Sequence, residues 1–311
     1  MKVVFMGTPE FAATALKELI KSHEITAVIT QPDKPAGRGK KISFPPVKEV
    51  AAANNINVYQ PQKIKDKAFI TQLSALNADI FVVAAYGQIL SKEILDMPKY
   101  GSVNIHASLL PKYRGAAPIQ WAIINGERET GITIIQMDEG IDTGAMILAE
   151  SIPIDSNETG ESLHNKLADL GGYTILKALK LIEAGSLRPT VQDDTLSTYA
   201  PMLKKETGRI DWTKSAEEIE RLIRGLYSWP SAFSHCTGFG IVKIIKAACI
   251  PYNTNEIPGG TIIDIDRKKG LIVATGHNAL LIEKIQIRGK KAMDVPAFLL
   301  GNEINKSMIF S

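Results

Sequence analysis

The sequence has little cysteine and no long apolar run. Its 311 residues include two cysteines, Cys236 and Cys249, without the spacing of zinc ligands. A disulfide framework and a structural zinc site are therefore not expected, and a reducing compartment fits best. No apolar stretch approaches the roughly 18 residues of a membrane span, and the apolar segment 3–6 is too short for a secretory signal. These absences predict a cytoplasmic protein without membrane association.

The glycine-rich loops that bind nucleotide phosphates are also missing. The turn after the first predicted strand lacks the three glycines of a dinucleotide fingerprint, and Glu10 would place negative charge where a pyrophosphate should bind. Thr8 is expected to cap the following helix, with Pro9 in its first position. The sequence contains no P-loop motif either. A dehydrogenase and a nucleoside triphosphatase are both disfavoured.

β-forming runs alternate with helical patterns in the first half of the chain, which predicts an α/β domain with a mainly parallel sheet. The run 80–85 is apolar on both faces, as expected of a central strand covered on both sides. The other predicted strands are 3–6, 25–29, 102–108, 130–137 and 145–154, and the predicted helices are 10–21, 47–53, 92–97, 119–124 and 158–183. The domain is expected to span 1–189.

A polar linker, 190–207, separates this domain from a second one over 208–311. One helix at 216–226 precedes short strands at 241–248, 260–265, 271–275 and 279–287, and Pro and Gly turns between them predict a small β-barrel. From Pro201 onward there are 16 Lys and Arg against 11 Asp and Glu. A surplus this small also occurs on ordinary solvated surfaces, so charge alone does not establish nucleic-acid binding.

Asn104 and His106 are the first candidates for catalysis. They are two residues apart in a predicted strand, so their side chains point to the same face. Open α/β sheets bind ligands at the carboxyl ends of parallel strands. In isolation, such a pair could equally be a hydrogen-bonded structural Asn and His.

Asp142 is the third candidate, in a turn between Gly140 and Gly144. By itself it could be an ordinary turn former. Together, Asn104, His106 and Asp142 supply what acyl transfer to an amine requires: a stabiliser of the carbonyl oxygen, a proton acceptor, and a carboxylate that orients the acceptor. No metal is expected in this chemistry.

Four segments together resemble the folate-dependent formyltransferases, and the resemblance covers nearly the whole chain. They are Asn104-Ile105-His106, Ser108-Leu109-Leu110-Pro111, the segment 114–120 (RGAAPIQ) and Asp142-Thr143-Gly144. Within that superfamily, the segments 7–11 (GTPEF), 31–41 (QPDKPAGRGKK) and 208–212 (GRIDW) are similar to the members that formylate charged initiator tRNA.

The resemblance implies a Rossmann-like formyltransferase domain joined to an OB-like β-barrel that binds tRNA. It implies 10-formyltetrahydrofolate as the formyl donor, the methionyl amine of initiator tRNA as the acceptor, and a monomer. Catalysis is assigned to Asn104, His106 and Asp142. Folate contacts are assigned to Ser108, Leu109, Leu110 and Pro111.

The basic loop 31–41 is expected to bind the tRNA through Lys34, Arg38, Lys40 and Lys41. Its proline and glycine residues predict an irregular backbone. Formyltransferases acting on glycinamide ribonucleotide or on an amino-sugar nucleotide are the nearest rivals, and neither would need this loop beside the site. A catalytically idle RNA-binding module is a further alternative, which the intact Asn104, His106 and Asp142 set disfavours.

Overall fold

Of the chain's 311 residues, the computed structural model describes 1–36 and 41–311. The chain forms two compact units. The first comprises Met1–Pro118, Glu129–Pro153 and His164–Ala200; the second comprises Ile119–Arg128, Ile154–Leu163 and Pro201–Ser311.

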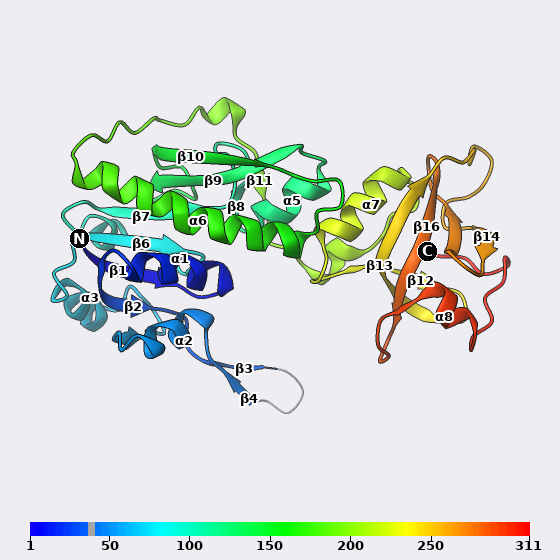
Figure 1. The fold of residues 1–311 in the computed structure, drawn as a ribbon, viewed down its shortest axis with the longest axis horizontal. Coiled ribbons are helices and arrows are strands. Elements are labelled where there is room, and N and C mark those ends of the chain that lie inside the picture. The colour runs from blue at the N-terminus through cyan, green and yellow to red at the C-terminus, as the bar shows by residue number, and fades with distance from the viewer. Residues whose placement is uncertain (37–40) are drawn as a thin grey trace. The chain divides into compact units, whose positions relative to one another are not determined.

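A seven-stranded sheet of order β10-β9-β7-β6-β1-β2-β5 forms the first unit (Figure 1). The five strands from β7 to β5 are parallel, whereas β9 and β10 are antiparallel. The strands are β1 (Lys2–Gly7), β2 (Glu24–Ile29), β5 (Val58–Tyr59), β6 (Ile80–Ala84), β7 (Ser102–His106), β9 (Glu129–Gln136) and β10 (Met146–Pro153). The predicted mainly parallel sheet is confirmed, and β6, apolar throughout, is its central strand.

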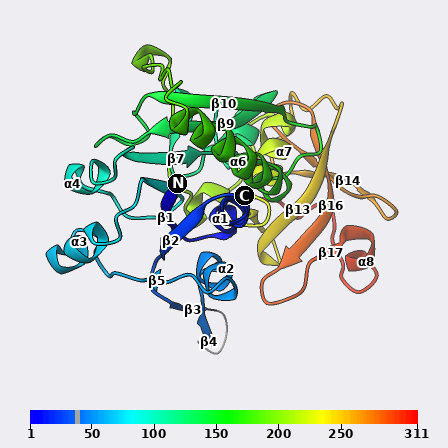
Figure 2. The same cartoon turned by 60° about the vertical axis from the view of Figure 1, so that its left-hand side comes forward.

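Helices cover both faces of this sheet, which explains why its strands are apolar on both sides. On one face, α1 (Glu10–Ile20) lies beside α6 (Gly160–Glu183), which belongs to this unit from His164 onward (Figures 1 and 2). On the other face, Phe81 and Val83 of β6 share a buried cluster with Leu73 of α3 (Lys67–Ser74) and Ile94 of α4 (Lys92–Leu95). The sequence patterns had not indicated α3.

The first helix begins at Glu10, as predicted, but its capping residue differs from the prediction. Pro9, rather than Thr8, is the N-cap residue of α1, and the carbonyl oxygen of Pro9 accepts from the amide of Ala13 (3.1 Å). The Thr8 hydroxyl instead donates to the carbonyl oxygen of Tyr86 (3.1 Å). Thr8 therefore ties the β1 turn to the segment after β6, and this tertiary bond takes the place of the local cap.

The basic segment is more regular than its composition suggested. β3 (Lys34–Ala36) and β4 (Lys41–Ser43) pair antiparallel, with Lys34 opposite Ser43. Just before β3, the Asp33 carboxylate accepts from Lys48 of α2 (Pro46–Ala53) at 2.6 Å and from Gln60 at 2.7 Å. The expectation of an irregular backbone is thus wrong for residues 34–36 and 41, whereas residues 31–33 have no regular structure.

The second unit is built on an antiparallel sheet of order β12-β13-β16-β15-β14, with β17 paired to β16. The elements are β12 (Ala232–Cys236), β13 (Gly240–Ile250), β14 (Ile262–Asp266), β15 (Gly270–Ala274), β16 (Ala279–Ile287), β17 (Met293–Asp294), α5 (Pro118–Ile124), α7 (Ala216–Gly225) and α8 (Val295–Leu299). Ser215 and Glu218 form a capping box at the start of α7, and the buried Ile219 and Ile223 pack into the core.

Residues 309–311 join the two outer strands of this sheet. Phe310 bridges Cys236 of β12, and Ile309 bridges Thr261, just before β14. The amide of Phe310 donates to the carbonyl oxygen of Gly260 (2.9 Å), while its ring packs against Trp212 with 5.5 Å between centroids. The closure leaves both outer strands paired, which supports the predicted barrel-like second domain.

In the described part of the chain, every helix is too short or too polar to span a bilayer.

Candidate active site

Strand β7 carries two of the proposed catalytic side chains to the carboxyl edge of the sheet. Its partners are Val83 of β6 opposite Asn104, and Thr133 of β9 opposite His106. A Cβ atom on Gly171 of α6 would lie 3.1 Å from Ile105, so Ile105 faces that helix. Because side chains alternate along a strand, Asn104 and His106 point to the opposite face. The predicted shared face is what the structure shows.

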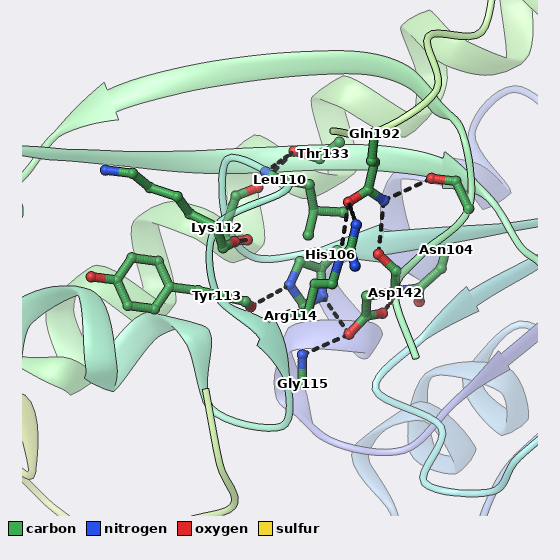
Figure 3. A network of polar contacts seen from close by, with 12 residues as sticks. Asn104, His106, Leu110, Lys112, Tyr113, Arg114, Gly115, Thr133, Asp142 and Gln192 are labelled. Carbon is green, nitrogen blue, oxygen red and sulfur yellow. Dashed lines mark hydrogen bonds and ion pairs between the residues drawn. The ribbon is translucent and has the colours of Figure 1, made fainter. Parts of the chain in front are cut away.

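The turn after β9 brings Asp142 to these two residues (Figure 3). One carboxylate oxygen, Oδ1, accepts from Nδ2 of Asn104 at 3.4 Å, and the other, Oδ2, lies 3.4 Å from Nδ1 of His106. The backbone amide of Gly115 also donates to Oδ2, at 2.9 Å. Asp142 has a φ of +54°, in the left-handed region that aspartate adopts more readily than most residues. Asp142, distant in sequence from Asn104 and His106, thus joins them in one polar cluster.

His106 is held by contacts on both ring nitrogens. Its side chain is nearly buried, with 5% of the residue exposed, and Nε2 lies 2.9 Å from the carbonyl oxygen of Tyr113. A carbonyl oxygen can only accept, which assigns the hydrogen to Nε2. Nδ1, beside Asp142, is then the nitrogen that carries no hydrogen when the ring is neutral. The sequence had not indicated which nitrogen would be engaged.

The four residues assigned to folate contacts lie in the loop that follows β7. Ser108 and Leu110 are buried, whereas Leu109 and Pro111 are half-buried. The Ser108 hydroxyl donates to the carbonyl oxygen of Lys112 (2.6 Å). The loop is anchored to β9 by Thr133, whose hydroxyl donates to the carbonyl of Ser108 and accepts from the amide of Leu110 (Figure 3). These contacts fix the backbone that leads to the carbonyl of Tyr113.

Two side chains in the cluster received no role from the sequence. Gln192 is buried, and its amide nitrogen donates to the carbonyl oxygens of Asp142 (2.8 Å) and Gly144 (2.7 Å). Its amide oxygen accepts from Nε (3.0 Å) and from a terminal nitrogen (2.8 Å) of Arg114. Arg114 belongs to a quoted motif, but Gln192 falls in the expected linker. No pattern in a single sequence separates it from other polar linker residues.

Two of the four basic residues assigned to tRNA lie in the β3–β4 pair. Lys34 is exposed in β3, and Lys41 lies in β4. Arg38 and Lys40 lie outside the described residues.

The two cysteines are not poised as nucleophiles. Burial raises the pKa of Cys236 to about 11, and burial together with the nearby carboxylates of Glu217 and Glu220 raises the pKa of Cys249 to about 11. Both therefore remain thiols at neutral pH. Within the described residues, no cluster of three or more His, Cys, Asp or Glu is placed to hold a metal ion.

Family models match both parts of the chain. Residues 1–179 match the model described as formyl transferase, and residues 202–303 match that of the formyl transferase C-terminal domain. The chain therefore belongs to the formyl transferase family.

Its relatives within the family narrow the class further. The chain is 51% identical over 310 residues to the methionyl-tRNA formyltransferase of Alkaliphilus oremlandii, covering 99% of each chain. It is 49% identical over 311 residues to the methionyl-tRNA formyltransferase of Clostridioides difficile, again covering 99% of each. The resemblance found in the sequence motifs is confirmed.

Solved structures from the rival classes share the fold. An N-formyltransferase from Helicobacter canadensis, solved with folinic acid and dTDP-3-aminofucose, has a TM-score of 0.64 at 21% identity; the match covers 91% of this chain and 98% of that one. A glycinamide ribonucleotide transformylase from Symbiobacterium toebii has a TM-score of 0.52 at 19% identity, over 62% of this chain and 94% of that one. At such identities the likeness speaks for the fold alone.

Proposed function

We propose that this chain transfers the formyl group of 10-formyltetrahydrofolate to the amino group of methionyl initiator tRNA, in support of translation initiation. The main support for the chemistry is that Asn104 and His106 each lie 3.4 Å from the Asp142 carboxylate, at the carboxyl edge of a parallel sheet. The choice of acceptor is supported by full-length relatives near 50% identity that carry this activity in their names. We further propose a cytoplasmic monomer that does not associate with membranes.

The reaction forms a bond between the amine nitrogen and the formyl carbon and breaks the bond from that carbon to N10 of the folate. The amine gives up a proton, and N10 takes one. Asn104 has two amide N–H groups; one is directed to Asp142, and the other donates to the oxyanion that develops on the formyl oxygen. Such a donor typically contributes about 2.7–4 kcal/mol to catalysis.

His106 accepts the amine proton on Nδ1, because Nε2 already donates to the carbonyl oxygen of Tyr113. The Asp142 carboxylate, 3.4 Å from Nδ1, stabilises the positive charge that the ring then carries. A positioned acid or base of this kind contributes roughly 10²- to 10⁴-fold to the rate. The Ser108 hydroxyl is directed to a backbone carbonyl and both cysteines are thiols, which favours direct transfer over a covalent formyl-enzyme.

The surroundings of the cluster suit a donor with a large planar ring. Ile89, in the loop after β6, and Ile141, next to Asp142, are 69% and 57% exposed. Large apolar side chains exposed near a polar cluster commonly mark a binding site. We propose that they and the loop Ser108–Pro111 form the folate site.

We propose that residues 1–189 form the catalytic domain and that residues 208–311 form the tRNA-binding domain. Lys34, Arg38, Lys40 and Lys41 are proposed to contact tRNA phosphates. The support is the exposure of Lys34 and the anchoring of the β3–β4 pair by Lys48 and Gln60. Each phosphate contact removed should reduce the salt slope of tRNA binding by about one unit. An unchanged slope in Arg38→Ala and in the double variant Lys40→Ala/Lys41→Ala, with folate binding as the control, would rule this contact out.

A competition among acceptors tests the function. The purified chain is incubated with 10-formyltetrahydrofolate and, in separate reactions, with methionyl initiator tRNA, glycinamide ribonucleotide and an amino-sugar nucleotide. We expect formylmethionyl-tRNA to form in the first reaction at a rate far above any transfer in the other two. Transfer to either small acceptor without transfer to the tRNA would overturn the proposal.

A further inference from the structure

The segment 190–200 is hydrogen-bonded to two parts of the proposed active site. At one end, Thr190 bridges Met146 at the start of β10, through two backbone hydrogen bonds of 2.8 Å. At the other end, β11 (Tyr199–Ala200) pairs with β8 (Arg114–Gly115), immediately after Tyr113. The segment is therefore bonded both to the strand that follows the Asp142 turn and to the loop that supplies the Tyr113 carbonyl.

Gln192 makes the side-chain connection between these two parts. Its two amide N–H groups go to the carbonyl oxygens of Asp142 and Gly144, and its oxygen accepts twice from Arg114 (Figure 3). All four hydrogen-bonding positions of this buried amide are thus filled by groups of the Asp142 turn and of β8. Substitution of Gln192 should therefore destabilise this region, because it leaves buried hydrogen-bonding partners unsatisfied.

The residues that Gln192 joins include or adjoin those that contact His106. The ring lies between the Tyr113 carbonyl on Nε2 and the Asp142 carboxylate on Nδ1. Tyr113 precedes Arg114 directly, and both Tyr113 (φ +61°) and Asp142 (φ +54°) have left-handed backbone conformations that side-chain-bearing residues rarely adopt. A backbone held in such a conformation needs support from its surroundings. Gln192 supports Asp142 directly through its carbonyl oxygen and lies one residue from Tyr113 through its bonds to Arg114. The Tyr113 amide donates to the Thr198 hydroxyl of the same segment (2.8 Å).

We infer that Gln192 is a positioning residue for formyl transfer: by bonding the Asp142 turn to Arg114, it sets the distance between the two groups that flank His106. The inference rests on the proposed function of this cluster, and it gives Gln192, a residue of the predicted linker, a role in catalysis. A misplacement of reacting groups by about 1 Å can cost up to roughly 100-fold in rate. Gln192 does not itself touch the reacting atoms, so its loss should act through His106 and Asp142.

Two variants test this inference. Gln192→Met keeps the length of the side chain and removes all four hydrogen bonds, whereas Gln192→Glu keeps the acceptor for Arg114 and removes both donors. Both are expected to lower kcat roughly 10- to 100-fold while the KM values for folate and tRNA change little. Val191→Ala, at a neighbouring side chain that is 83% exposed, and Thr174→Val, which removes a buried hydrogen bond within α6, are the matched controls. Both controls should keep wild-type kcat.

The ¹⁵N resonances of the His106 ring, recorded on each variant, give a readout that does not depend on activity. They should shift in both Gln192 variants and not in the controls, because only the former alter the contacts of the ring. If Asp142→Asn is slow but both Gln192 variants keep wild-type kcat and wild-type ring resonances, Gln192 has no positioning role. If the wild type fails to formylate the tRNA, the proposed function is lost, and the ring resonances alone then decide whether Gln192 positions His106.

Discussion

The core of the second unit is mainly apolar, whereas the sheet edge of the first unit buries a cluster of polar and charged groups. In the barrel, Trp212, Ile244 and Phe310 belong to one apolar cluster, and the sheet is closed by backbone pairing. At the edge of the first sheet, His106 and Gln192 are buried among carbonyls, a carboxylate and a guanidinium. Apolar packing tolerates small displacements, but hydrogen-bonded networks lose their partners when they move. The proposed chemistry therefore lies where buried hydrogen bonds fix the groups, whereas the barrel core is held mainly by apolar packing.

Phe310→Ala should destabilise the barrel and leave the sheet of the first unit unaffected. The ring is 2% exposed and contacts Trp212, so its removal leaves a cavity and weakens the closing strand. We expect a loss of about 3–5 kcal/mol in the free energy of unfolding of the barrel. Hydrogen exchange should show lost protection in β12 and β14 and unchanged protection in β7. Equal loss in β7 would mean that the two units do not differ in the way described.

Asn104→Ala should lower the rate of formyl transfer and leave the stability of the first unit nearly unchanged. Losing one oxyanion donor is expected to raise the activation free energy by about 2.7–4 kcal/mol, which lowers kcat roughly 10²- to 10³-fold. The melting temperature should be nearly unchanged, because the side chain is half-buried. Rates under saturating substrates and a thermal melt measure the two effects. Near wild-type turnover would remove Asn104 from the mechanism.

Asp142→Asn should give a smaller effect. Asparagine matches aspartate in shape and also tolerates a positive φ, so the turn should persist while the charge beside His106 is lost. We expect kcat to fall roughly 10- to 100-fold, less than the 10²- to 10⁴-fold of a positioned acid or base, because Asp142 acts through His106. Asp142→Ala is the comparison, and it should in addition lose stability, since alanine adopts this backbone conformation less readily. Full activity in Asp142→Asn would make Asp142 an ordinary turn residue.

Lys48→Met should give the smallest effect. The hydrogen bonds from Lys48 and Gln60 hold the pKa of Asp33 below its ordinary value of 3.8. Their contribution to stability is therefore present above the unfolded pKa and lost as the pH falls through the folded one. The variant should raise the pKa of Asp33, as followed by ¹³C NMR of the carboxylate, whereas Lys21→Met, which contacts Glu18 instead, should not.

Much of this arrangement could be predicted from the sequence, and the exceptions have physical reasons. Strand alternation was enough to place Asn104 and His106 on one face, because the side-chain period of a strand is local. The start of α1 at Glu10 was predicted correctly, but its cap was not, because Thr8 bonds to Tyr86, 78 residues away. Gln192 was missed for a similar reason: its partners, Asp142 and Arg114, are distant in sequence, and nothing local marks a polar residue in a linker as buried.

A double-mutant comparison tests most directly the claim that the buried polar edge acts as one catalytic unit. Single-turnover formyl transfer to methionyl initiator tRNA would be measured for the wild type, His106→Ala, Asp142→Asn and the double variant. Because Asp142 acts through His106, we expect the double variant to be no slower than His106→Ala alone. Multiplicative losses, or single variants close to the wild-type rate, would contradict this account.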